Sequence, residues 1–157
     1  MLVAQSNLAT TYRKLGRHEQ ALSTRRDVYS ITVKVYGEDH ERTLTEASNY
    51  AGVLNELNRF QEVKSWLCKR IPVARRVIGE NHSVTLTLRR NYARALYEDT
   101  GATLNDVREA VTILEDIAGT SRRVIGGAHP LTEGIESHLR KSRAALRARE
   151  TLSSGTA

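Results

Sequence analysis

The chain has 157 residues, a formal net charge of +6 and a hydrophobic fraction of 39%, which together suit a single domain with its own core. Its only cysteine, Cys68, excludes an intrachain disulfide and a cysteine-based zinc cluster, and it fits a reducing compartment. No stretch resembles a signal peptide or could cross a bilayer, so we expect a soluble cytoplasmic protein with no membrane span.

Apolar residues recur three or four positions apart along the chain, which is the period of an amphipathic helix. Ala21, Val28 and Val35 form a row at the matching seven-residue spacing, which is two helical turns, and Ala110, Ile117 and Val124 form another. The pattern predicts an all-α chain of seven antiparallel helices without a strand. We expect these helices at about 2–16, 18–36, 41–58, 60–79, 83–100, 104–125 and 130–150, followed by a disordered tail at 151–157.

Three similar octets mark the ends of the second, fourth and sixth expected helices: VKVYGEDH at 33–40, RRVIGENH at 75–82 and RRVIGGAH at 122–129. Their closing histidines are 42 and 47 residues apart, a spacing typical of a repeat array. We interpret each octet as a joint, in which the glycine takes the left-handed conformation that ends a helix. Asp39 and Asn81 are candidates to cap the next helix, and Pro130 suits a first helical turn.

The joints divide the chain into repeats at about 2–43, 44–85 and 86–132, with a capping helix at 133–150, and together these form one domain at 1–150. The third repeat carries five extra residues near Gly101, where Thr103 and Asp106 could form a capping box. Each repeat is a pair of amphipathic helices, and neither helix can bury its apolar stripe without neighbours.

The segments SNLATTYRKLGRHEQAL (6–22) and VYGEDH (35–40) resemble the 42-residue tetratricopeptide repeat (TPR) of the kinesin-light-chain type. This resemblance implies a right-handed α-solenoid of about three and a half repeats. The second repeat departs from the family pattern, because Asn58 stands where glycine is usual and Val63 where alanine is usual. Pro72 also lies inside a predicted helix, where it removes one hydrogen bond.

The resemblance further implies a non-catalytic scaffold that binds an extended peptide or partner protein in a concave groove formed by the first helix of each repeat. Asparagines in that groove commonly hold a ligand's backbone, because an amide can donate and accept hydrogen bonds together. An open alternative is that these asparagines only bond neighbouring helices. The net positive charge of the groove favours an acidic peptide. The candidate groove residues are Asn7, Asn49, Asn91, Arg13, Asn55, Tyr97, Arg90 and Arg94.

Other chemistry has weaker support in the sequence. His40, His82 and His129 lie at successive joints, too far apart to share a zinc ion, and capping or surface roles are favoured for them. No phosphate-binding glycine motif and no nucleophile motif is present. We therefore expect no catalytic residues, no metal, no cofactor, no small-molecule substrate and no enzyme activity.

Two other function classes stay open at this point. The array resembles the C-terminal sensor portion of nucleotide-switch (NB-ARC-type) proteins, so the chain could be a detached piece of a longer protein. The stretch LRKSRAALRAR (139–149) has five cations and no acidic residue, as a nucleic-acid adaptor would. It lacks stacking aromatic residues, so the nucleic-acid function is the least favoured of the three.

Overall fold

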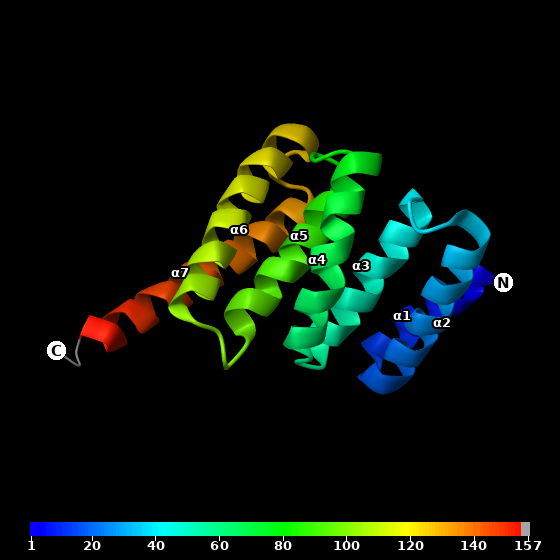
Figure 1. Ribbon diagram of the computed structural model, residues 1–157, viewed down its shortest axis with the longest axis horizontal. Helices are drawn as coiled ribbons and strands as arrows, with labels where there is room; N and C mark the ends of the chain where they lie inside the picture. Colours follow the sequence, from blue (N-terminus) through cyan, green and yellow to red (C-terminus); the bar gives the residue numbers. More distant parts are fainter. Residues whose placement is uncertain (155–157) are drawn as a thin grey trace.

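The computed structural model describes residues 1–154, which form seven helices and no strand. All seven helices lie where the sequence predicts them, and pairs of helices follow one another in chain order from one end of the molecule to the other (Figure 1). Their bounds are α1 Leu2–Lys14, α2 His18–Tyr36, α3 Glu41–Glu56, α4 Phe60–Val77, α5 Ser83–Glu98, α6 Leu104–Ile125 and α7 Pro130–Ser154.

The prediction of a disordered tail from 151 is wrong for residues 151–154, which continue α7. The preceding stretch is rich in alanine and arginine, which favour the helix, and Glu150 bonds Arg108 of α6 at 3.2 Å. The ion pair near the end of α7 and the high helix propensity of the preceding residues explain why the helix continues for one more turn. Residues 155–157 lie outside the described residues.

The helices form two layers. Each helix packs on the next one in the chain, and among the odd-numbered helices α3 also packs on α5 and α5 on α7. The even-numbered helices form the other layer, so that α1 and α7 lie behind α2 and α6 in Figure 1. We call the outer surface of α1, α3, α5 and α7 the odd-helix face. It corresponds to the predicted concave groove.

The core consists of two apolar clusters. One lies mainly between α2, α3 and α4 and includes Leu54 and Leu67; the other joins α5, α6 and α7 and includes Leu96, Leu114 and Ile135. Tyr92 contacts both. The rows of apolar residues seen in the sequence supply these clusters, which explains why the repeats stack.

The three joints share one hydrogen-bond pattern over the sequence Gly-x-x-His-x-x-Thr. Gly37, Gly79 and Gly126 have positive φ of 86°, 95° and 91°, which confirms the predicted conformation. Two residues beyond each joint histidine, a backbone N–H donates to its Nδ1 atom. The threonine hydroxyl donates to the glycine carbonyl, at 2.6 to 2.8 Å. Each joint is therefore closed by its own residues: Gly37, His40, Thr43; Gly79, His82, Thr85; and Gly126, His129, Thr132.

The predicted caps Asp39 and Asn81 are wrong, because the histidine one residue later occupies the capping position. Asp39 instead pairs with Arg76 of α4 at 2.9 Å. The histidines thus have the capping role that the sequence also favoured for them, although aspartate and asparagine are the more usual caps.

The turns within repeats differ from one another. Asn58 has a φ of 58° where the first repeat has Gly16 with 71°. Asparagine can take this left-handed conformation because its short polar side chain can form local hydrogen bonds. The third repeat uses the predicted capping box of Thr103 and Asp106 instead, which confirms that prediction. Helix α4 continues through Pro72.

Candidate functional site

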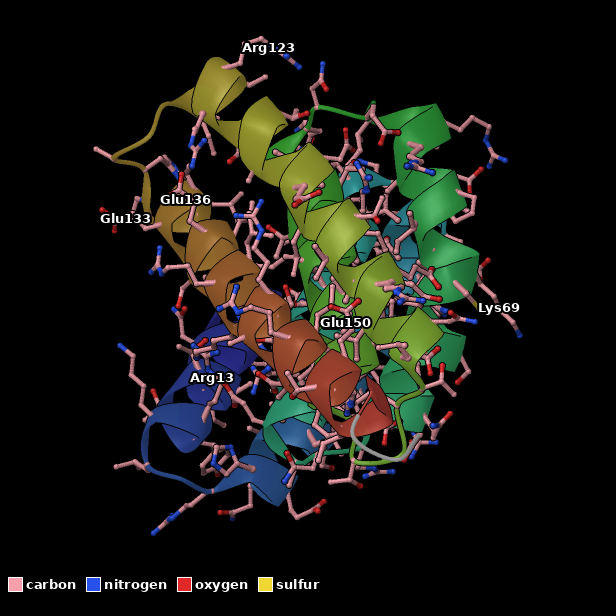
Figure 2. The ribbon with its side chains drawn as sticks, turned by 90° about the vertical axis from the view of Figure 1, so that its left-hand side faces the viewer. Arg13, Lys69, Arg123, Glu133, Glu136 and Glu150 are labelled. Atoms are coloured by element: carbon pink, nitrogen blue, oxygen red, sulfur yellow. The ribbon has the colours of Figure 1, made fainter. Side chains whose placement is uncertain are left out.

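The odd-helix face carries the predicted groove residues, but only some of them are accessible. Asn7 and Arg13 are exposed on α1, and Asn49 is half-buried on α3, with its amide donating to Glu46 at 3.3 Å. Arg13 and Lys69 lie on opposite sides of the molecule, which distinguishes this face from the even-numbered layer (Figure 2). A cavity of about 360 Å³ opens beside Asn7, where α1, α2 and α3 meet.

Asn55 and Asn91 do not face the surface. The Asn55 side chain is completely buried and donates to the backbone carbonyl of Asn91 at 3.1 Å, and the Asn91 amide donates to the carbonyl of Ser48 at 3.2 Å. A buried amide needs such partners, and the neighbouring helix supplies them. Both buried amides bond a neighbouring helix, as the packing alternative expects for Asn91, and neither is exposed to a ligand on the odd-helix face.

Tyr97 is also buried, and its hydroxyl lies 2.7 Å from Nδ1 of His138 on α7 and 3.2 Å from Glu98. Burial, followed by the charge of Glu98, raises the pKa of the Tyr97 phenol. Burial, followed by the charges of Arg90 and Arg94, lowers the pKa of His138 to about 4. This cluster ties α5 to α7, and its phenol and imidazole are both neutral near pH 7.

Arg90 and Arg94 lie one turn apart on α5. Arg94 pairs with Glu98 at 2.7 Å, whereas Arg90 forms no ion pair within residues 1–154, and its Nε atom is buried without a hydrogen-bond partner. Burial, followed by the charge of Arg94, lowers the pKa of the Arg90 guanidinium. Gly134 of α7 leaves room for this guanidinium, since a Cβ there would lie 3.2 Å from its Nη1.

A guanidinium that is largely withdrawn from water without an anionic partner is energetically costly. The charge that acts with burial on the pKa of Arg90 is another cation, Arg94, so the site would accept a carboxylate or another anion. This is the strongest electrostatic feature of the odd-helix face.

Sequence reasoning missed His138 and a polar network between α1, α2 and α3. His138 follows Asn91 at the 47-residue step, so the repeat register could have placed it on the odd-helix face. In the network, Arg25 donates to Ser6, Thr10 and Glu46 at 2.6, 2.8 and 3.0 Å. The sequence did not predict this network, because Arg25 is followed by Arg26 and looks like one of several pairs of adjacent arginines on a helix surface.

The basic stretch 139–149 is partly used within the fold. It forms the middle of α7, where Leu139 and Ser142 are buried and Arg143 pairs with Glu115 of α6 at 2.6 Å. Among residues 1–154 no group of three or more potential metal ligands comes together. No helix within that range is long and apolar enough to span a membrane.

Part of the chain matches a known repeat family. The model of the tetratricopeptide repeat family matches residues 1–75. Curated protein sequences yield no significant match to the chain.

Three solved structures share the fold. A Podosopora anserina protein assigned as a kinesin light chain, with nearly identical TPR-like repeats, is 23% identical with a TM-score of 0.77, over 92% of this chain and 66% of that one. A variant of that protein, with one glutamine replaced by methionine, is 18% identical with a TM-score of 0.57, over 96% of this chain and 88% of that one. BtubC (BKLC) from P. vanneervenii is 16% identical with a TM-score of 0.68, over 99% of this chain and 64% of that one.

The chain thus spans 66% and 64% of the length of two of these neighbours, and at such identities the similarity concerns the fold. Sequence and structure nevertheless agree, since the family match covers the first repeats and the structural match covers nearly every helix. The described residues thus have the fold of a tetratricopeptide-repeat solenoid, similar to that of the structures with kinesin-light-chain-like repeats, and residues 1–75 also match the repeat family in sequence.

Proposed function

We propose that this array is a non-catalytic protein-interaction scaffold that binds an extended acidic peptide on its odd-helix face. The observation that carries the proposal is Arg90, a mostly buried cation with no anionic partner in the described part of the chain. A carboxylate from a partner would complete this site with a charge-assisted hydrogen bond.

Other features of the face support an acidic ligand. Lys14 is exposed and forms no ion pair within residues 1–154, and Arg13 beside it is also exposed, with Glu56 as its partner. Asn7 and Asn49 present amides that could bond a peptide backbone and set its register. Electrostatics would mainly speed association, and the effect would weaken as salt screens the exposed charges.

The test is to select peptides from a random library on the full chain and to measure their dissociation constants for the parent and for Arg90→Gln. We expect an acidic pool, and binding about tenfold weaker to the variant, because one charge-assisted bond is lost. Arg123→Gln is the matched control: it removes the same charge from the exposed end of α6, away from this face (Figure 2), and should leave affinity unchanged.

A second pair of variants tests the backbone contacts. Replacing Asn7 and Asn49 together by alanine should weaken binding without lowering helicity, since neither side chain is buried. A basic or purely apolar pool, or equal affinity in Arg90→Gln and Arg123→Gln, would contradict the proposal.

A further inference from the structure

A separate cavity of about 500 Å³ lies on the opposite side of the array, between α2 and α4 and above α3. A second cavity of about 330 Å³ shares four of its lining residues, Tyr29, Tyr50, Glu62 and Trp66, so the opening extends along the two helices. We call this combined opening the α2–α4 seam. Its volume is in the range of ligand pockets.

The wall of the seam is a rigid aromatic cluster. The Trp66 ring centroid lies 4.9 Å from that of Tyr29 and 5.0 Å from that of Tyr50, so rings from α2, α3 and α4 meet at one point. The indole N–H of Trp66 donates to the carbonyl of Ala47 at 3.2 Å, which fixes the orientation of the ring. The wall thus offers partly exposed apolar surface that needs no rearrangement to receive a ligand.

Arg70 supplies the charge of the seam. Its guanidinium lies 3.3 Å from the centroid of Trp66 and donates to the Tyr29 hydroxyl at 2.9 Å and to the Trp66 carbonyl at 3.0 Å. All of these partners are neutral. Its Nε atom is buried and has no hydrogen-bond partner among the described residues. Arg70 therefore retains an unused donor and an uncompensated charge.

The repeat register shows that Arg70 is an exception. The matching positions in the first and third repeats are Val28 and Ile117, which are 1% and 0% exposed. An aliphatic side chain at this position fills the core of its repeat. The arginine leaves that space open and puts a cation beside it, a costly arrangement unless the charge has a use.

The next seam, between α4 and α6, provides an internal comparison. There Ile71, Tyr92 and Ile113 take the places of Tyr29, Tyr50 and Trp66, beside a cavity of about 340 Å³. Its buried cation, Arg89, is neutralised by Glu80 and Asp116 at 2.7 and 2.8 Å. The α4–α6 seam thus has a buried arginine with carboxylate partners, whereas the arginine of the α2–α4 seam has none within residues 1–154.

The rim of the α2–α4 seam is also positive. Lys69 and Arg26 are exposed and form no ion pair within residues 1–154. Of the two carboxylates at the rim, Glu62 is bound to Arg59 at 2.5 Å, which leaves only Glu38 free. The charge of the seam is complementary to an anion.

We propose that the α2–α4 seam is a second binding site, which takes a partner peptide segment with an apolar side chain next to acidic residues. The apolar side chain packs against Trp66 and Tyr50, and a carboxylate pairs with the partly exposed guanidinium of Arg70, with Lys69 close by on the same wall. This site does not depend on the odd-helix face, because it lies on the other layer and uses no residue of that face.

The experiment uses Trp66, the only tryptophan of the chain, as its reporter. The probe is the acetylated and amidated peptide Gly-Leu-Glu-Glu-Gly, and the glutamine peptide Gly-Leu-Gln-Gln-Gly is its neutral match. We expect the acidic probe to shift tryptophan emission in a saturable way and the neutral probe to bind about tenfold more weakly.

Two variants locate the charge. Lys69→Gln, at an exposed position, should weaken the response to the acidic probe, and Arg70→Ile should abolish it. Because Arg70→Ile installs the residue type that the third repeat has in its core, the melting temperature should be unchanged or higher while binding is lost. A purely structural role for Arg70 would instead give a lower melting temperature.

Arg90→Gln and Arg123→Gln should bind the acidic probe as the parent does. Absence of a tryptophan response to the acidic probe would overturn the proposal, and so would equal responses to both probes. A response that persists in Arg70→Ile, or that disappears in Arg90→Gln, would do so as well. The last result would place the peptide on the odd-helix face and leave that proposed function standing.

Discussion

The junction between the first and second repeats differs from the junction between the third repeat and α7. At the first, Arg25 is 7% exposed and is held by two hydroxyls and the Glu46 carboxylate. At the last, a continuous apolar cluster joins α5, α6 and α7. The joints in the chain are nevertheless the same in both places. The joints therefore set the same connection between helices in every repeat, while a few side chains determine how strongly neighbouring repeats stabilise each other.

The repeat register shows how few these side chains are. Arg25 stands where the second and third repeats have Leu67 and Leu114, which are fully buried. Together with Arg70 it places two arginines in core positions on either side of one junction. A buried ion pair stabilises a fold no better than the apolar residues it replaces. Helix α1 buries only Ala9, so we expect the first repeat to open before the rest.

The largest effect should follow a change in the apolar half. Leu114→Ala removes a fully buried side chain from the cluster of α5, α6 and α7 and should lower the free energy of unfolding by about 3–4 kcal/mol. Urea denaturation measures it. Leu15→Ala, at a residue that is 63% exposed, is the control and should change it by less than about 0.5 kcal/mol. Similar losses in both variants would mean that the apolar cluster contributes little.

Breaking the polar junction should cost somewhat less and act locally. Glu46→Gln leaves Arg25 buried without its anion and should destabilise the first repeat by about 2–3 kcal/mol. Amide hydrogen exchange should accelerate in α1 and α2 and stay unchanged in α6 and α7. Asp39→Asn, in the exposed pair with Arg76, is the matched control, with an expected cost below about 0.5 kcal/mol. A uniform acceleration over all helices would refute the difference between the junctions.

The joints should respond equally in both halves. Gly37→Ala and Gly126→Ala each force a side chain into positive φ and should each cost about 1 kcal/mol, seen as matched losses in thermal or urea unfolding. Gly119→Ala, inside α6 with open space around it, should instead stabilise by up to about 1 kcal/mol. If the two joint variants differ strongly, the joints are not equivalent.

The last effect is absent at neutral pH, appears only on acidification, and concerns the C-terminal half. The folded chain lowers the pKa of His138 from 6.5 to about 4, so between these values the unfolded state takes up a proton that the folded state does not. Stability from this group is complete above pH 6.5, declines as pH falls towards about 4, and declines no further below that. Arg90, Arg94 and Lys141 oppose the protonation of this group, and Glu98 favours it.

Urea unfolding of the parent and of His138→Gln across this range measures the difference. The variant should lose the part of the pH dependence that lies above about pH 4. Asp99 and Asp106 have lowered pKa values and therefore act below 3.8, outside this window. Identical pH profiles would show that the imidazole is as hydrated in the folded chain as in the unfolded one.

The sequence predicts the helices and joints well because their causes are local. Glycine at the end of a helix and apolar residues at helical spacing act within a few residues of each other. Asn55 and Asn91 could not be placed in this way, since the same repetition arises whether an amide serves a ligand or a neighbouring helix. Arg70 stands in the core register, yet only the structure shows that its Nε atom has no hydrogen-bond partner within residues 1–154. Helices and joints are determined by residues close in sequence, whereas the hydrogen-bond partners of a polar side chain come from helices far along the chain.

The closed joints have a consequence for how such a chain can change over time. Because the threonine hydroxyl donates to the glycine carbonyl and the histidine ring accepts from a backbone N–H, all within seven residues, a joint needs no contact beyond the first turn of the helix that follows it. A gene segment of one period, duplicated or deleted between corresponding points, would carry or remove a complete joint together with one pair of helices. The five extra residues of the third repeat lie in the turn within its helix pair and not in a joint. We therefore expect this array to tolerate the gain or loss of whole repeats, each a joint with one pair of helices, better than insertions within a joint.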